Sequence, residues 1–196
     1  MSRRIVIANP RSGRQLDTLA YEIVKSFQPE ILAEPGAFDI ERFFDCALEA
    51  ITEIKTDYRP LPDGIHGYTD SQTMESVIST ELIEDPGQLF FARSTMGHEA
   101  GHAIIHVPEF RLKKAILTSI HNAQHGAALR LHRESDVPIF QNPEWQAWRF
   151  AGALLMPAVA IREAIRRGNG LRELARLFQV NPAFVETRLR ALKITL

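Results

Sequence analysis

The sequence predicts an α+β fold that is mainly helical, with a small antiparallel sheet beside one histidine-containing helix. Apolar side chains recur at helical spacing in much of the chain, for example in residues 13–27. Residues 65–83 instead favour two or three short extended strands. Asn142 and Pro143 mark a further helix start, because asparagine caps helices and proline suits their first position. Helices that are separate in the sequence from a short antiparallel sheet are typical of the α+β class.

The first 83 residues are expected to form two helices and then the strands. The helix over 13–27 has one apolar stripe, made of Leu16, Leu19, Ile23 and Phe27. Asp39 is the expected cap of a second helix that runs to about Ile54. A turn-rich sequence with two prolines, residues 59–64, separates this helix from the extended segments 65–68 and 74–83.

The rest of the chain alternates between strong helical patterns and one irregular stretch. A helix is expected over 89–106, and Pro108 should end it, because proline lacks an amide hydrogen and clashes with the preceding turn. Residues 110–141 are interpreted as an irregular insertion that contains one helix at most. A helix over 142–155 and two short helices from about Leu171 follow. We therefore divide the chain into a domain of residues 1–160 and a helical pair within 161–196.

The composition indicates an ordinary globular protein. The chain has 196 residues, 45% of them hydrophobic, and a single cysteine, Cys46, so an internal disulfide is excluded. The apolar run near the N-terminus covers only Ile5 to Ala8, which is too short for the core of a signal peptide. We expect a soluble, cytoplasmic protein that does not enter a membrane.

The charges are distributed unevenly along the chain. Residues 1–110 hold 9 basic and 18 acidic side chains, whereas residues 161–196 hold 8 basic and 3 acidic ones. A basic tail is compatible with contacts to DNA, and equally with an ordinary solvated surface.

The chemistry of the chain is indicated by the sequence His98-Glu99-Ala100-Gly101-His102 within the helix expected over 89–106. Residues four apart on a helix differ by about 40° in direction, so both imidazoles project to one side and can hold one metal ion. Glu99 is rotated by about 100° from His98 and can reach a water beside the metal. This arrangement is typical of zinc peptidases, in which the glutamate is the general base.

A catalytic zinc needs a third protein ligand and an open fourth position. Glu144 is a candidate, since it stands in the first turn of the helix over 142–155, although a helix start favours a carboxylate in any case. The other candidates are histidines at positions 106, 121, 125 and 132. His106 is disfavoured, because its direction drifts by a further 40° or so from that of His102.

Two motifs together resemble the ImmA/IrrE family of metallopeptidases. The first is His98 to His102, and the second is Glu144-Trp-Gln-Ala-Trp-Arg-Phe-Ala-Gly-Ala-Leu-Leu-Met-Pro157. The resemblance covers roughly residues 40–195. It implies a zincin-like fold and one zinc ion per chain, held by His98, His102 and Glu144, with Glu99 as the catalytic base. Trp148 departs from the family pattern, which usually has asparagine there.

The resemblance also implies a biological role. Members of the family cleave helix-turn-helix repressors of the Cro/cI type in mobile-element or stress-response switches, so such a repressor is the expected protein substrate. The alternative is a DNA-binding or repressor-binding regulator whose metal site is not catalytic.

The C-terminal segment itself has the outline of a helix-turn-helix. Asn181 and Pro182 mark the start of its second helix, on or near which lie Arg188, Arg190 and Lys193. These side chains could contact DNA, but packing of the pair on the rest of the protein is the favoured interpretation.

Overall fold

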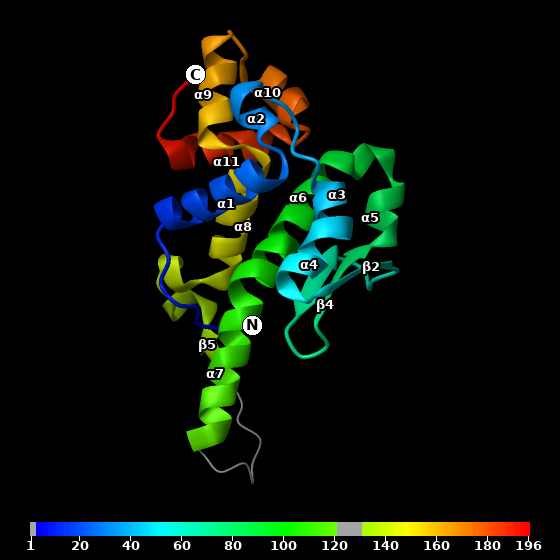
Figure 1. Cartoon of the computed structure of the whole chain (residues 1–196), viewed down its shortest axis with the longest axis vertical. Helices are drawn as coiled ribbons and strands as arrows, with labels where there is room; N and C mark the ends of the chain where they lie inside the picture. The colour runs from blue at the N-terminus through cyan, green and yellow to red at the C-terminus, as the bar shows by residue number, and fades with distance from the viewer. Residues whose placement is uncertain (1–2, 121–130) are drawn as a thin grey trace.

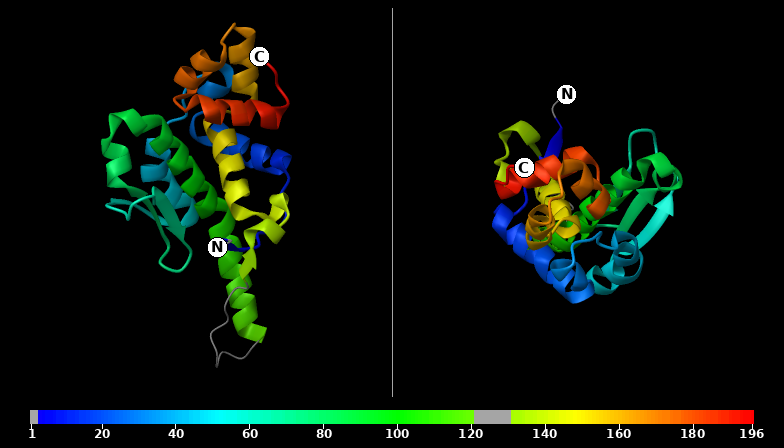
Figure 2. Two further views of the ribbon diagram at one scale, coloured as in Figure 1. Left: turned by 180° about the vertical axis from the view of Figure 1, so that it is seen from behind. Right: turned by 90° about the horizontal axis from the view of Figure 1, so that it is seen from above.

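The computed structural model describes residues 3–120 and 131–196, and it confirms the α+β class (Figure 1). Two long helices cross at the centre, α6 (Leu89–Gly101) and α8 (Pro143–Leu155). The three-stranded sheet lies on one side of α6, while α8 and then α1 (Gly13–Phe27) lie on the other, as Figure 2 shows from two further directions. The crossing of α6 and α8 places the two sequence motifs against each other.

The N-terminal helices form as expected. Helix α1 begins with a capping box, in which Ser12 and Gln15 satisfy each other's backbone amides. Asp39 caps the second helix, as predicted, by accepting from the amide of Arg42. This helix consists of α3 (Ile40–Arg42), a π-helical turn (Phe43–Ala47) and α4 (Leu48–Thr52). A further short helix, α2 (Glu30–Ala33), lies between the two helices that the sequence predicted.

The small sheet consists of β2 (Lys55–Arg59), β4 (Glu75–Ser79) and β3 (Gly67–Asp70), in that spatial order. Strands β3 and β4 are antiparallel, as expected, and β2 joins β4 in parallel. The second extended segment ends earlier than predicted, because α5 (Thr80–Glu84) follows β4 at once. A short 3-10 turn (Pro86–Gln88) then leads into α6, against which β3 and β4 pack.

The helix that carries the first motif does not end at Pro108, so that prediction was wrong. After α6 the chain forms a π-helical turn (His102–His106) and continues as α7 (Val107–Ile120), which projects away from the body in Figure 1. Pro108 therefore lies inside one continuous helix, directly after a π-helical turn whose wider spacing accommodates a residue without an amide hydrogen. The first part of the expected irregular insertion is consequently a regular helix.

The second part of the insertion returns to the body through a small ribbon. Strand β5 (Leu131–Arg133) pairs antiparallel with β1 (Arg4–Val6), so that His132 lies opposite Ile5. Two 3-10 turns, Glu134–Asp136 and Ile139–Gln141, then lead to α8, whose cap Asn142 accepts from the amides of the first turn. Nothing in the sequence predicted this pairing between the chain's start and its middle.

Three helices follow Pro157. The structure adds α9 (Ala158–Arg166), which was not expected, to the expected pair α10 (Leu171–Phe178) and α11 (Pro182–Leu192). Buried side chains of this pair, such as Phe178 and Val185, belong to the same hydrophobic core as α1, α6 and α8. The division at residue 160 stays a prediction.

One of the three basic side chains expected near the surface of α11 faces inward. Arg188 is 2% exposed and donates to Asp17 and to the backbone carbonyl of Met156. It thus fastens α11 to α1 and to the end of α8, and it is not available to a phosphate backbone.

Across residues 3–120 and 131–196, no helix combines the length and the apolar character that a membrane crossing requires.

Candidate metal centre

The site depends on a close approach of α6 to α8. A methyl group on Gly101 would lie 3.1 Å from a ring carbon of Phe150 and 3.2 Å from the Cα atom of Ala147. Gly97 has a similar position one turn earlier, 3.3 Å from the Ala151 methyl group. The glycine inside the first motif is therefore what allows the two backbones to come close enough for a side chain of α8 to reach the histidines.

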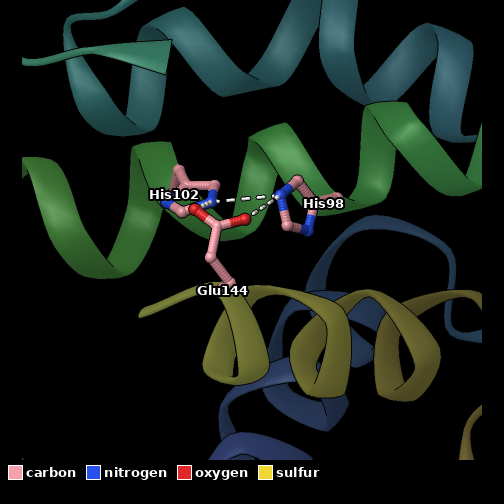
Figure 3. A group of neighbouring side chains, drawn as sticks. All are labelled: His98, His102 and Glu144. Carbon is pink, nitrogen blue, oxygen red and sulfur yellow. Dashed lines mark hydrogen bonds and ion pairs between the residues drawn. The ribbon is translucent and has the colours of Figure 1, made fainter. Parts of the chain in front are cut away.

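His98, His102 and Glu144 come together as the sequence predicted (Figure 3). The Nε2 atoms of the two histidines are 3.1 Å apart. The carboxylate of Glu144 reaches from α8, with Oε2 at 3.5 Å from His98 Nε2 and Oε1 at 3.7 Å from His102 Nε2. The two imidazoles and the carboxylate thus form a small triangle of side chains between the helices, with one ligand atom of each residue within 4.8 Å of the others.

The triangle has the size and the chemistry of a zinc site. Zinc binds histidine nitrogen and carboxylate oxygen at about 2.0–2.2 Å with tetrahedral geometry, which corresponds to ligand–ligand separations of roughly 3.3–3.5 Å. The two histidine nitrogens are 3.1 Å apart, and the nitrogen–oxygen separations, 3.5 Å to Oε2 and 3.7 Å to Oε1 of Glu144, lie close to that value. Two imidazoles and one carboxylate leave one tetrahedral position open, as in catalytic rather than structural zinc sites.

Glu144 is ionised in this setting. Burial by itself raises its pKa, but the neighbouring His98 and His102 and the guanidinium of Arg3 outweigh burial and lower the pKa to about 2. The Arg3 Nη2 atom lies 3.1 Å from Glu144 Oε1. A carboxylate that stays charged at neutral pH is suited to hold a divalent cation.

A chain of hydrogen bonds sets the tautomer of His102. The Gln146 side-chain amide nitrogen donates to the carbonyls of Asn9 and Phe140, both at 2.8 Å, so its oxygen must face His106. His106 Nε2 therefore donates to that oxygen at 3.1 Å, and His106 Nδ1 accepts from His102 Nδ1 at 3.0 Å. With its proton on Nδ1, His102 presents the lone pair of Nε2 to the triangle.

His98 is oriented in a different way. Its Nδ1 atom has no hydrogen-bond partner in the described parts of the chain. The ring instead packs against the indole of Trp148, with centroids 4.2 Å apart and planes inclined by 35°. The tryptophan that departs from the resembled family is therefore in direct contact with one of the expected ligands.

Glu99 lies beside the triangle and is held from the sheet. The hydroxyl of Thr69 on β3 donates to Glu99 Oε2 at 2.7 Å and lies 3.0 Å from the hydroxyl of Ser76 on β4. Glu99 is 5% exposed, and this burial raises its pKa, while His98 lowers it. A raised pKa suits a carboxylate that must take up and release a proton near neutral pH.

The remaining sequence candidates lie elsewhere. His106 acts on His102 and does not join the triangle, and His132 belongs to β5. His121 and His125 fall outside the described residues. Sequence reasoning missed Thr69 and Gln146, for which no motif spacing gave a signal. For His106 the signal was present, since it follows His102 by four residues and so shares its side of the helix.

The family model described as IrrE N-terminal-like domain, Peptidase_M78, matches residues 91–190, a span that contains both motifs. The chain belongs to this family. Membership confirms the resemblance found in the sequence and places the chain among zincin-like peptidases and regulators.

A solved structure supports the fold. The chain is similar to a Mycobacterium tuberculosis transcriptional regulator, with a TM-score of 0.57 and 17% sequence identity. The alignment covers 90% of this chain and 46% of that one, so the chain spans less than half the length of the regulator. No curated protein matches the chain.

Proposed function

We propose that this protein is a zinc-dependent endopeptidase. The observation that carries the proposal is the convergence of His98, His102 and Glu144 into a triangle of zinc-site dimensions, with the buried carboxylate of Glu99 beside it. Membership in the IrrE N-terminal-like family agrees with this function. The three residues of the triangle would hold the ion.

The ion, when bound, would polarise the scissile carbonyl group and make a water molecule more acidic. The protein's own side chains transfer the protons and orient the ligands. Glu99 takes the proton from the attacking water and later delivers it to the leaving amine. Thr69 occupies Oε2 of that carboxylate and so directs the proton transfer to Oε1. His106 and Gln146 keep the lone pair of His102 on the metal side.

For the substrate we propose a helix-turn-helix repressor of the Cro/cI type, cleaved in a mobile-element or stress-response switch. The support is the family resemblance, together with the name of the similar solved structure, which is a transcriptional regulator. The partner is thus a protein.

The decisive experiment compares the wild type with Glu99→Gln. We expect both proteins to bind about one zinc per chain, because Glu99 is not one of the ligands, and only the wild type to cleave a repressor supplied with it. His98→Ala and Glu144→Ala should lose both zinc and cleavage. A Glu99→Gln protein that cleaves at the wild-type rate would refute this mechanism.

The alternative is a regulator that binds DNA or a repressor without cleaving it. Direct contact with DNA is disfavoured, because Arg188 is buried against Asp17. A tight complex with a repressor that yields no cleavage products, even with zinc supplied, would favour a binding function. Salt-dependent duplex binding that survives Glu99→Gln would favour a DNA-binding one.

A further inference from the structure

A cavity of about 680 Å³ opens between α1, α8 and α11, next to the metal centre. Its size falls within the range of small-molecule and side-chain binding pockets. These three helices are neighbours in Figures 1 and 2, so the cavity joins the N-terminal helix, the helix of the second motif and the last helix of the chain.

One wall of the cavity is aromatic. Trp145, Trp148 and Phe184 line it, and the rings of Trp148 and Phe184 meet edge to face at 5.8 Å. The indole of Trp148 also contacts the ring of His98. A group bound in the cavity would therefore touch a side chain that also touches an expected metal ligand. Such a wall suits a flat or aliphatic group.

The floor of the cavity carries more positive than negative charge. Asp17 accepts from Arg149 Nη2 and from Arg188 Nη1, so two guanidinium groups share one carboxylate. Arg14 also lines the cavity and adds a third positive charge. Burial lowers the pKa of Arg188 to about 10, which shows how costly this enclosed charge is. The floor thus carries three guanidinium groups and one carboxylate, which leaves a net positive charge.

A purely structural role accounts for only part of this arrangement. Arg188 and Asp17 tie α11 to α1, as described above. Arg149 is not needed for that tie, although its own ion pair with Asp17 joins α8 to α1, and its guanidinium lines the cavity. Gly13 leaves room for this guanidinium, because a methyl group there would lie 2.9 Å from Arg149 Nε. Because Asp17 is shared by Arg149 and Arg188, one of the two positive charges is not neutralised within the lining.

We propose that this cavity binds an apolar or aromatic group that carries a carboxylate. The aromatic wall would hold the apolar part, and the carboxylate would be paired with the arginine-rich floor, since guanidinium–carboxylate pairs are strong and directional. The ligand is either part of a peptide or a free small acid. In the first case the cavity is a specificity pocket of the proposed peptidase, and that reading rests on the proposed function.

The chain offers a direct probe of this cavity. Its only two tryptophans, Trp145 and Trp148, both line the wall, so intrinsic tryptophan fluorescence reports occupancy. The full-length protein, with and without added zinc, is titrated with N-acetyl-phenylalanine and with its uncharged amide. We expect a saturable fluorescence change and an affinity for the acid about tenfold or more above that for the amide.

Variants separate the floor from the wall. Arg149→Gln should bind acid and amide about equally, whereas the matched Arg190→Gln, on an exposed part of α11 outside the cavity, should keep the preference for the acid. Ala191→Phe, at the lining, should weaken both ligands without altering a charge. Circular dichroism identifies any variant that does not fold. If Arg149→Gln does not fold, Ala191→Phe still tests whether the ligand binds in this cavity.

The outcomes are distinct. No saturable change, equal affinities in the wild type, or an unchanged preference in Arg149→Gln would each overturn the proposal. A blocked peptide with adjacent phenylalanine and aspartate that also saturates the signal identifies a peptide as the source, and saturation by N-acetyl-phenylalanine alone identifies a free acid. Since fluorescence requires no hydrolysis, a failure of peptide cleavage would leave the binding result intact.

Discussion

Replacing His106 by phenylalanine should weaken zinc binding by roughly 10- to 100-fold, although His106 is not an expected ligand. Phenylalanine keeps a ring of similar size in this position, which is 1% exposed, but it cannot accept the hydrogen bond from His102 Nδ1. In the metal-free variant, His102 can move its proton to Nε2, where Glu144 is near enough to interact. In the zinc-bound form the proton must stay on Nδ1, without an acceptor.

The magnitude follows from that difference. A buried donor without an acceptor costs about 1–3 kcal/mol, and about 1.4 kcal/mol corresponds to a tenfold change in affinity. His106→Asn, which restores an acceptor near the position of Nδ1, should recover part of the loss. The assay is competition for zinc against a chelator of known affinity, with His132→Phe on β5 as the matched control. Wild-type affinity in His106→Phe would refute the hydrogen-bond chain as the device that orients His102.

The remaining predictions concern pH, packing and catalysis. Burial, opposed in part by the hydrogen bond to Gln146, lowers the pKa of His106 to about 4 from an ordinary value of 6.5. The unfolded chain therefore binds more protons between these values, so stability that is present above pH 6.5 is lost as the pH falls toward 4. Between pH 6.5 and pH 4 the free energy of unfolding of the zinc-free wild type should fall by about 3 kcal/mol more than that of His106→Phe, as measured by urea unfolding. Equal decreases in the two proteins would contradict this. Gly101→Ala should cost about 1–3 kcal/mol of unfolding free energy and weaken zinc binding, because the methyl group forces α8 away from α6. Gly36→Ala, where the added methyl group would meet nothing closer than 3.9 Å, should change neither. Thr69→Val should lower kcat for repressor cleavage about tenfold with zinc content unchanged, because Glu99 loses a charge-assisted hydrogen bond; an equal effect of Thr56→Val on β2 would indicate a general disturbance of the sheet.

Local patterns in the sequence predicted much of the helical structure. The caps Asp39 and Asn142 start helices where expected, because a side-chain oxygen two or three residues from a free amide is a local interaction. Other features depended on context. Pro108 did not end its helix, because the π-helical turn directly before it accommodates a residue that has no amide hydrogen. The strand pair β1–β5 joins segments far apart in the chain, and no local pattern encodes such a partner.

The expected site shows the same division. The spacing of His98 and His102 by itself fixed the direction of both imidazoles, since a four-residue step on a helix is a geometric constant. Glu144 could be proposed from its motif, but only the packing of α8 on Gly97 and Gly101 brings it to within 3.5 Å of His98.

What the sequence by itself determined is local: the histidine pair on one helix face, Glu99 about 100° from His98 on the same helix, and the caps Asp39 and Asn142 that start two of the helices. What only the tertiary structure decided is which groups from other elements meet them: Thr69 on Glu99, the Gln146–His106 chain on His102, and the indole of Trp148 on His98. The physical reason is the distance along the chain over which each interaction acts. Helical periodicity and capping act over a few residues, whereas these contacts require elements that are far apart in the sequence to pack side by side.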